Sequence, residues 1–381
     1  MPPRIAMVAG EASGDLLAGH LIGALRRRLP DAEFVGIGGP RMEAAGFEAW
    51  WPAERLAVRG YAEVLRHYRG ITRIRRQLLA RLLRERPQVF IGVDAPDFNL
   101  WLEARLRRAG IPAVHYVSPS IWAWRRGRLP KIARAVSHVL ALFPFEPEIY
   151  RGAGVPVTYV GHPLADVIPV EIDLRAARDK LAIHPAGPVI ALLPGSRQSE
   201  LQYMAGLYVE TAMLLHQRFP AAQFLVPLVS RETRAIFEEA MWSKGAQELP
   251  FKLLFGHAQD ALAAADGALV ASGTATLEAA LTKTPMVIAY RMSPWSWRLM
   301  RRMRYQPWVG LPNILAGRFV VPEFLQDDAT PENLAQALGN LVEDRRVADG
   351  LRETYRAIHL TLRQDTATRA ADAVVSCLAP P

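Results

Sequence analysis

The chain has 381 residues, of which 50% are hydrophobic and 22% are charged, which predicts a globular rather than a disordered protein, with two domains of roughly 160 to 200 residues each. Its formal net charge of +9 favours an acidic partner such as nucleic acid, anionic lipid or a phosphorylated substrate. The single cysteine, Cys377, excludes an internal disulfide and suits a reducing cytosol, and no apolar run reaches the ~18 residues of a membrane-spanning helix.

The first part of the chain alternates short apolar runs with stretches of helical periodicity. Strands are predicted at 4–9, 33–37, 88–93, 113–117 and 138–142. Strands that alternate with helices indicate a parallel sheet covered on both faces, and ligands bind beyond the carboxyl ends of such strands. The loops that we therefore expect at one edge of the sheet are 10–15, 38–40, 94–99 and 118–124.

A break with two prolines and a glycine, residues 161–169, resembles an interdomain linker, and a second series of strands follows it. These strands are predicted at 189–193, 223–227, 251–254, 268–271 and 286–290. The segments 332–343 and 347–378 are predicted to be helical, the first with Thr330 as N-cap and Pro331 at its first position. We expect an N-terminal domain at 1–165, a second domain at 166–345, and a helical tail at 346–381 that packs on the N-terminal domain of the same or a partner chain.

The stretch 268–281 is the most informative single segment. An apolar strand stops at Ser272-Gly273-Thr274, and helical spacing begins after it. Ser272 or Thr274 can cap this helix, Gly273 lets the backbone approach a ligand, and the free N–H groups of the first turn form an anion site. Glu278 follows near the start of the helix and can accept hydrogen bonds from sugar hydroxyls. Alternatively, this is a plain turn, and Glu278 is a surface residue that suits the helix dipole.

Two doubly wound α/β domains, Rossmann-like and facing across a cleft, match the architecture of the B type of glycosyltransferase. Six segments, in this order, resemble the signatures of the bacterial lipid A disaccharide synthase family: 10–15, 92–99, 116–124, 193–197, 272–278 and 311–315. The resemblance implies transfer of 2,3-diacylglucosamine from UDP-2,3-diacylglucosamine to 2,3-diacylglucosamine 1-phosphate. The products would be the β-1′,6-linked disaccharide 1-phosphate and UDP.

Asp94 ends its strand at the expected ligand edge, and the resemblance favours it as the base that takes the proton of the acceptor hydroxyl. Direct displacement then inverts the anomeric carbon of an α-linked donor. Glu11 is the alternative base, because its loop follows the neighbouring strand. A competing interpretation is that Asp94 or Asp97 only caps the following turn. The residues expected to bind the acceptor are Ser13, Gly14, Asp97, Asn99, Ser118 and Trp124.

Arg197 follows a strand and a tight Pro-Gly-Ser turn, a position from which a guanidinium can pair with a diphosphate and stabilise the leaving group. The alternative is a solvated arginine at a helix start. Glu278 is the candidate for the ribose hydroxyls. Asn313 is the candidate for a polar contact to the donor, unless it only shapes a turn after Pro312. The residues expected to bind the UDP-sugar are Gly195, Ser196, Arg197, Ser272, Gly273, Thr274, Glu278 and Asn313.

The sequence gives no indication of a metal or a cofactor. It has no Cys/His cluster and no Asp-x-Asp pair after a strand. His115 lies inside an apolar strand and is predicted to be a core histidine, and His162 is predicted to make a structural hydrogen bond. A catalytic role is therefore not assigned to either histidine.

Two stretches combine basic and apolar residues. Arginines interleave with apolar side chains over 55–86, and 294–304 adds Trp295 and Trp297 to four arginines. A surface of this kind can lie on anionic lipid, so we expect a cytoplasmic protein that is peripheral on the inner face of the inner membrane. For 294–304, a helix that packs one face on its own domain is an equal alternative. The resemblance also favours a homodimer.

Four rival functions share part of this pattern. The transferase that adds N-acetylglucosamine to a lipid-linked muramyl peptide, and UDP-N-acetylglucosamine 2-epimerase, have the same two-domain plan, but the loops at 10–15 and 118–124 do not favour them. Nucleic-acid binding fits the charge alone, since no helix-turn-helix or zinc pattern is present, and we expect no nucleic-acid partner. An NAD enzyme is disfavoured because no Gly-x-Gly-x-x-Gly opens the first helix.

Overall fold

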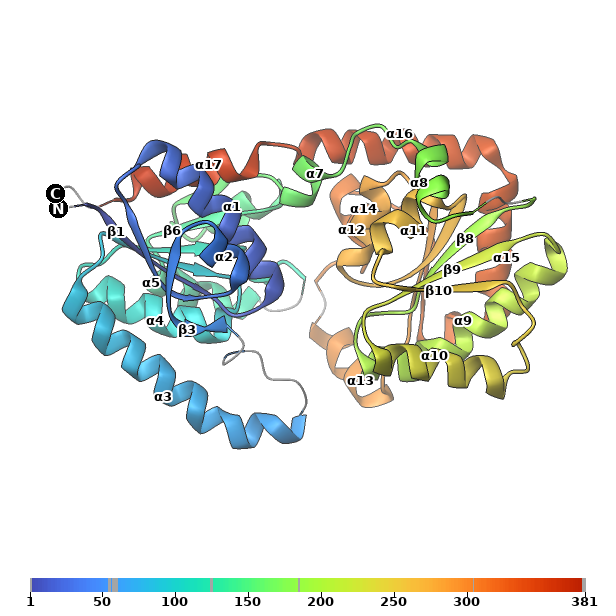
Figure 1. Cartoon of the computed structure of the whole chain (residues 1–381), viewed down its shortest axis with the longest axis horizontal. Coiled ribbons are helices and arrows are strands. Elements are labelled where there is room, and N and C mark those ends of the chain that lie inside the picture. Colours follow the sequence, from blue (N-terminus) through green and yellow to red (C-terminus); the bar gives the residue numbers. More distant parts are fainter. Residues whose placement is uncertain are drawn as a thin grey trace. The chain divides into compact units, whose positions relative to one another are not determined.

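The computed structural model describes residues 2–53, 56, 61–123, 126–183, 186–303 and 305–378. The chain divides into two compact units. Unit 1 consists of Met1–Asp166 and Leu362–Pro381, and unit 2 consists of Val167–Thr361. Each unit is an α/β domain built on its own parallel sheet (Figure 1).

The sheet of unit 1 has seven parallel strands in the order β3-β2-β1-β4-β5-β6-β7. The strands are β1 (Arg4–Ala9), β2 (Glu33–Gly38), β3 (Phe47–Pro52), β4 (Val89–Val93), β5 (Ala113–Tyr116), β6 (His138–Ala141) and β7 (Val157–Tyr159). The five strands predicted for this unit are confirmed, and each of their ends agrees with the structure to within one residue. The sequence did not predict β3 and β7, which are the two edge strands and are only partly buried.

Helices cover both faces of this sheet because each buries one apolar stripe against it. On one face, Leu21 and Leu25 of the first helix pack with Val374 near the C-terminus, and Figure 1 shows these two helices, blue α1 and red α17, side by side. On the other face, Leu78 and Leu102 pack against the strands. The helices of unit 1 are α1 (Ala12–Arg28), α2 (Pro40–Ala44), α3 (Tyr61–Glu85), α4 (Pro96–Arg108), α5 (Leu129–Ala135), α6 (Glu146–Arg151), α7 (Pro163–Val167, whose last residue belongs to unit 2) and α17 (Thr366–Ser376).

The sheet of unit 2 has six parallel strands in the order β10-β9-β8-β11-β12-β13. The strands are β8 (Val189–Leu193), β9 (Gln223–Leu228), β10 (Phe251–Phe255), β11 (Gly267–Ala271), β12 (Met286–Tyr290) and β13 (Glu323–Leu325). The first five confirm the predicted strands. The sixth, β13, is a partly buried edge strand of three residues that the sequence did not predict.

The helices of unit 2 are α8 (Leu174–Lys180), α9 (Gln198–Arg218), α10 (Arg231–Ser243), α11 (Ala258–Ala264), α12 (Thr274–Leu281), α13 (Pro294–Met303), α14 (Leu311–Ala316), α15 (Pro331–Glu343) and α16 (Arg345–Leu362). The predicted start of α15 is confirmed, since Thr330 Oγ1 accepts a hydrogen bond of 3.2 Å from Asn333 N and Pro331 opens the helix. Within the described residues, no helix is long and apolar enough to cross a membrane.

The chain passes between the units twice, after Asp166 and after Thr361. Asp166, at the first passage, contacts the chain just after the second. Its carboxylate accepts hydrogen bonds from Asp365 N at 3.0 Å and Thr366 N at 2.7 Å, and it so caps α17. The expected tail at 346–381 is consequently divided: α16 belongs to unit 2 up to Thr361, and α17 belongs to unit 1.

Candidate active site

The turn at Asp94 lies in the middle of the carboxyl edge of the unit 1 sheet. Ala9 of β1 pairs with Val93 on one side, and Tyr116 of β5 pairs with Val93 on the other. Asp94 N donates a hydrogen bond of 2.8 Å to Tyr116 O. The loops that follow β1 and β5 therefore flank Asp94, as the parallel topology requires.

The backbone at this turn is strained. Asp94 and Ala95 have φ angles of 51° and 43°, in the left-handed region that residues other than glycine, asparagine and aspartate rarely occupy. Strain of this kind persists where the surroundings hold it, and it concentrates at functional sites. Asn99 holds this turn, because its Nδ2 donates to Asp94 O at 2.8 Å. Asn99 is completely buried, so the predicted direct contact with an acceptor is corrected to support of the turn at Asp94.

The capping interpretation of Asp94 and Asp97 is not borne out. Helix α4 has Ala95 as its N-cap and no side-chain cap hydrogen bond. The carboxylate of Asp97 is exposed and forms an ion pair of 2.9 Å with Arg128 Nη2. Both carboxylates are thus left outside the hydrogen bonding of the helix start.

The turn after β2 is fixed by a residue of α1 that sequence reasoning did not single out. Asp15 is buried, and its carboxylate accepts hydrogen bonds from Gly39 N at 3.0 Å, Arg41 N at 3.0 Å and Met42 N at 3.1 Å. It therefore joins α1 to the start of α2. Glu11 and Ser13 remain exposed at the edge of the sheet, whereas Gly14 is buried against β4.

The loop after β5 contains Ser118, which is buried with its Oγ 2.8 Å from Tyr150 Oη. Trp124, the other acceptor residue predicted in this loop, lies outside the described residues. Glu146, at the start of α6, is 1% exposed and accepts a hydrogen bond of 2.9 Å from Phe143 N. Burial raises the pKa of Glu146 to about 7, although the Phe143 N–H and the nearby Ser118 and Trp122 side chains favour the charged form.

In unit 2 the loops after β8 and β11 lie at the same edge, since Leu193 pairs with Val270. Gly195 has a φ of 122°, and the carboxylate of Glu200 packs beside it and accepts hydrogen bonds from Ser196 N at 3.0 Å and Arg197 N at 3.2 Å. The side chain of Arg197 is 79% exposed, with Nη1 3.5 Å from Glu200 Oε1. Glu200 thus fixes the turn, and the guanidinium beside it is accessible.

The start of α12 differs in one respect from the expectation. Its N-cap is Gly273, with a φ of 138°, and no side chain caps the helix. Ser272 Oγ instead donates to Val309 O at 3.4 Å, and Thr274 is the first helical residue, so the predicted side-chain cap was wrong. A helix start without a side-chain cap keeps its N–H groups available to an anion. Burial raises the pKa of Glu278, which lies just beyond the first turn.

Asn313 is completely buried in α14. Its Nδ2 donates to Val321 O at 2.9 Å and to Glu323 Oε1 at 2.8 Å, and its Oδ1 accepts from Val320 N at 2.7 Å and Val321 N at 2.8 Å. An amide side chain can make no more than about four such bonds. The amide of Asn313 therefore has no free group for the predicted donor contact. Asn313 lies in α14, and its amide holds residues 320–323 and not a turn directly after Pro312.

A family model described as lipid-A-disaccharide synthetase matches residues 5–375. A lipid-A-disaccharide synthase of Dechloromonas aromatica is 62% identical over 376 residues, covering 98% of this chain and 98% of its own. The chain belongs to the lipid-A-disaccharide synthase family. A lipid-A-disaccharide synthase of Azoarcus is 61% identical, covering 99% of this chain and 97% of its own. The resemblance inferred from six segments is thereby confirmed, and with it the assignment as a glycosyltransferase.

Solved structures confirm the B-type glycosyltransferase fold of this lipid-A-disaccharide synthase family member. An Anabaena protein in complex with UDP and glucose has a TM-score of 0.58 at 14% identity and covers 99% of this chain and 100% of its own. UDP-GlcNAc 2-epimerase from Neisseria meningitidis, bound to UDP-GlcNAc, has a TM-score of 0.63 at 13% identity and covers 98% of this chain and 99% of its own. At such identities the likeness concerns the fold alone, so it does not favour the epimerase alternative.

Three other features of the chain bear on the site. Within the described residues, no group of three or more His, Cys, Asp or Glu side chains is placed to hold a metal ion. His115 is a buried core histidine, as predicted, with Nδ1 2.7 Å from Glu103 Oε1. His162 makes the predicted structural hydrogen bond, accepting from Leu164 N at 3.3 Å, and burial lowers its pKa to about 4.

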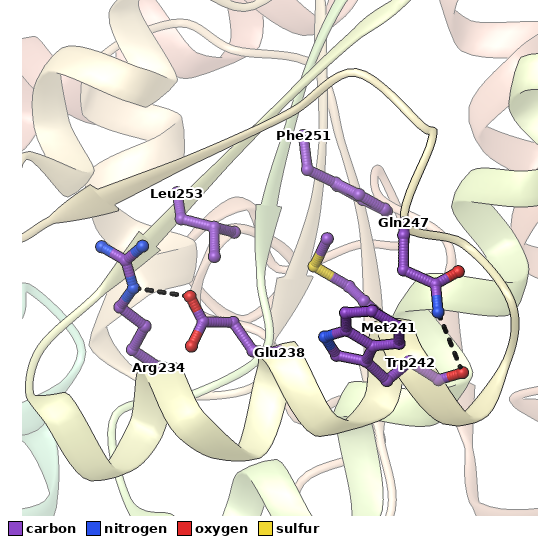
Figure 2. A pocket seen from close by; sticks show the side chains of 7 residues that line it. All are labelled: Arg234, Glu238, Met241, Trp242, Gln247, Phe251 and Leu253. Atoms are coloured by element: carbon purple, nitrogen blue, oxygen red, sulfur yellow. Dashed lines mark hydrogen bonds and ion pairs between the residues drawn. The ribbon is translucent and has the colours of Figure 1, made fainter.

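A hollow of about 560 Å³ lies elsewhere in unit 2, between α10 and the edge strand β10 (Figure 2). Trp242 in its lining is 72% exposed, and Arg234 Nε donates to Glu238 Oε1 at 2.8 Å one turn away on the same helix. None of the residues lining this hollow is a predicted site residue. The candidate site therefore rests on the strand ends and not on this hollow.

Proposed function

We propose that this protein transfers 2,3-diacylglucosamine from UDP-2,3-diacylglucosamine to 2,3-diacylglucosamine 1-phosphate, with inversion at the anomeric carbon. The observation that carries the proposal is the strained turn at Asp94, flanked by the loops after β1 and β5. It supports a carboxylate held at a fixed place on the acceptor side. The products are the β-1′,6-linked disaccharide 1-phosphate and UDP.

On the acceptor side, Asp94 takes the proton of the attacking hydroxyl as that oxygen bonds to the anomeric carbon and the bond to UDP breaks. Its support by Asn99 and by the peptide of Tyr116 favours it over Glu11, which is exposed and has no comparable support from neighbouring strands. Glu11 remains the alternative base. Ser13, Gly14, Asp97, Ser118 and Trp124 bind the acceptor sugar and its phosphate.

On the donor side, Arg197 pairs with the diphosphate and stabilises the charge that develops on it. Its exposed guanidinium and the start of α12, which carries no side-chain cap, support this role. Glu278 accepts hydrogen bonds from the ribose hydroxyls. The backbone of Gly195, Ser196, Ser272, Gly273 and Thr274 completes the contacts with UDP.

The acyl chains of both substrates require a lipid surface, and we place the protein on the inner face of the inner membrane. In α13, Trp295 is 80% exposed and Arg298 lies 5.7 Å from the centre of its ring, which suits an interface with anionic lipid. The stretch 55–86 adds Arg73, Arg76 and Arg84, which are exposed on α3, whereas residues 54–55 and 57–60 and the side chains of 61–69 lie outside the described residues. Exchange of the C-terminal helices in a homodimer is part of the same proposal.

The test is UDP release in detergent from the two diacylated substrates, with wild type, Asp94→Ala, Glu11→Ala and the control Asp31→Ala, which alters an exposed carboxylate away from the site. Acceptor-dependent release that falls by about 10²-fold or more in Asp94→Ala, with UDP affinity kept, supports the base assignment. Acceptor-independent turnover by wild type would refute the transfer. Full activity in Asp94→Ala with loss in Glu11→Ala would move the base to Glu11.

A further inference from the structure

One carboxylate on the edge strand β13 holds the segment that leads into α14. Glu323 Oε2 accepts a hydrogen bond of 2.9 Å from Val309 N, and Glu323 Oε1 accepts one of 2.9 Å from Gly310 N. Glu323 Oε1 also accepts a hydrogen bond of 2.8 Å from Asn313 Nδ2, inside α14. Two successive peptide N–H groups before the helix therefore point at the same side chain.

The same segment also contacts the start of α12. Ser272 Oγ donates to Val309 O at 3.4 Å, and Leu311 N donates to Thr276 Oγ1 at 3.4 Å. The Thr276 hydroxyl donates in turn to Gly273 O at 2.8 Å. A hydroxyl can donate and accept at once, so Thr276 joins the two segments. Residues 309–311 thus connect the carboxylate on β13 to the start of α12.

Gly310 lets this segment lie directly on the sheet. A Cβ there would come within 2.3 Å of Ile288 Cδ1 on β12 and within 3.0 Å of Glu323 Oε1. Strand β12 lies between β11, which leads into α12, and β13, on which Glu323 pairs with Ile288. The backbone of Glu323 is therefore held by the sheet, and its side chain offers a fixed place to the two N–H groups.

Capping of α14 does not account for the contacts of Glu323. A side chain that caps a helix accepts hydrogen bonds from the N–H groups of the first turn. Helix α14 has Gly310 as its N-cap and no side-chain cap hydrogen bond, and the N–H of Leu311, its first residue, donates to Thr276. Glu323 accepts from the two N–H groups that precede this turn. It therefore fixes the approach to the helix, which is the part that contacts Ser272.

The start of α12 depends on such contacts for its shape. Gly273 is its N-cap, with a φ of 138°, and no side chain caps the helix. The N–H groups of such a helix start can bind an anion, and they bind it more tightly where the turn is already held in the bound conformation. Ser272 and Thr276 hold the turn through residues 309–311.

We propose that Glu323 is a positioning residue for the donor site: its carboxylate fixes residues 309–311 and, through Ser272 and Thr276, the start of α12 that receives the diphosphate of UDP. Glu323 itself touches no substrate. The inference rests on the proposed function, because it concerns the donor half of that reaction. It predicts an effect on UDP binding, which can be measured without turnover.

The experiment measures UDP affinity by calorimetry, both KM values in detergent, and urea unfolding. The variants are Glu323→Gln, Thr276→Val and the combination of the two. Glutamine has the shape of Glu323, but its amide nitrogen cannot accept, so one of the two N–H groups before α14 loses its acceptor. Glu323→Asp, with a shorter side chain, carries the test where Glu323→Gln does not fold. Asp327→Asn is the matched control, since Asp327 is an exposed carboxylate in the turn that follows β13.

We expect Glu323→Gln and Thr276→Val each to weaken UDP binding about tenfold, which corresponds to the loss of one hydrogen bond to a charged group. The donor KM rises by a similar factor, while the acceptor KM stays at its wild-type value. The double variant binds UDP no more weakly than the weaker single variant, because both substitutions release the same segment. Asp327→Asn behaves as wild type in every measurement.

Three results would overturn the inference. They are a UDP affinity within twofold of wild type in a folded Glu323 variant, an equal rise in both KM values, and fully additive losses in the double variant. A loss of stability in urea without a loss of UDP affinity would likewise assign Glu323 to the fold alone. A wild type that binds UDP but shows no acceptor-dependent UDP release would instead refute the proposed function, and the calorimetric test of Glu323 would still hold.

Discussion

Replacement of Glu146 by glutamine should change how the stability of unit 1 depends on pH. Burial raises the pKa of this carboxyl from 4.5 to about 7 in the folded protein. Between these values the folded chain keeps a proton that the unfolded chain has lost, so the free energy of unfolding falls as pH rises through the window. At ~1.4 kcal/mol for each pH unit, the loss amounts to ~3 kcal/mol.

His162 acts in the opposite sense. Burial lowers its pKa from 6.5 to about 4, so the unfolded chain binds the extra proton and stability rises with pH over that range. Between pH 4.5 and 6.5 the two slopes oppose each other at ~1.4 kcal/mol per pH unit each, and wild type should show little net change from this pair. Tyr150 and Tyr159, which also lie near Glu146, stay neutral there because burial raises the pKa of each, that of Tyr159 to about 12.

Glu146→Gln removes one slope and leaves the other. Relative to wild type, the variant should gain ~3 kcal/mol between pH 4.5 and pH 8, or about a hundredfold in hydrogen-exchange protection. The assay is exchange measured by mass spectrometry on peptides that span 113–123 and 138–151, with both proteins compared at each pH so that the intrinsic exchange rate cancels. A protection ratio that stays constant from pH 4.5 to 8 would refute the reasoning. Glu148→Gln, which changes an exposed carboxylate of the same helix α6, should give that constant ratio.

Three further predictions concern unit 2. Arg197→Ala should lower kcat/KM by about 10²- to 10³-fold in the UDP-release assay with stability unchanged, because the exposed guanidinium contributes to the leaving group and little to the fold; a loss below threefold would contradict its role. Gly195→Ala should weaken UDP binding in calorimetry by about tenfold, since a Cβ there would meet the Glu200 side chain at 2.8 Å. Gly245→Ala is the control, because Gly245 also has a positive φ, of 67°, but an added Cβ would have no atom within 4 Å. Asn313→Ala should cost about 2–4 kcal/mol in urea unfolding of unit 2, because it leaves the Val320 and Val321 N–H groups without their acceptor. A cost under ~0.5 kcal/mol would mean that residues 320–321 need no such support.

The interior of both sheets was predictable because buried parallel strands are continuous apolar runs. Val89–Val93 and Val189–Leu193 contain no charged residue and are bounded by turn residues, so they can be read directly. The edge strands give a weaker signal, since β7 and β13 have three residues each, all partly exposed. These short segments become strands by pairing with the neighbouring strand, and the local sequence carries no information about that pairing.

The place of the site was predictable for a related reason, whereas the roles of its side chains were only partly so. Parallel topology brings the strand ends to one edge, so Asp94 and Glu11 could be placed there from sequence, as could Arg197 in the second sheet. Asn99 also lies near the end of its strand, but its amide turns inward to backbone groups, as does the amide of Asn313 in α14. A polar residue near a strand end has the same sequence context whether it faces a ligand or supports a turn.

In both units, a carboxylate side chain holds a loop at the carboxyl end of the sheet. A loop that binds a substrate needs exposed groups, yet its own backbone N–H groups must be satisfied for it to hold one shape. A carboxylate placed behind the loop accepts those N–H groups: Asp15 does so for the start of α2, and Glu200 for the turn at Arg197. Substitution of the exposed Arg197 should then affect binding or chemistry at nearly constant stability. Substitution of Glu200, or of Asp15 in unit 1, should lower activity and stability together.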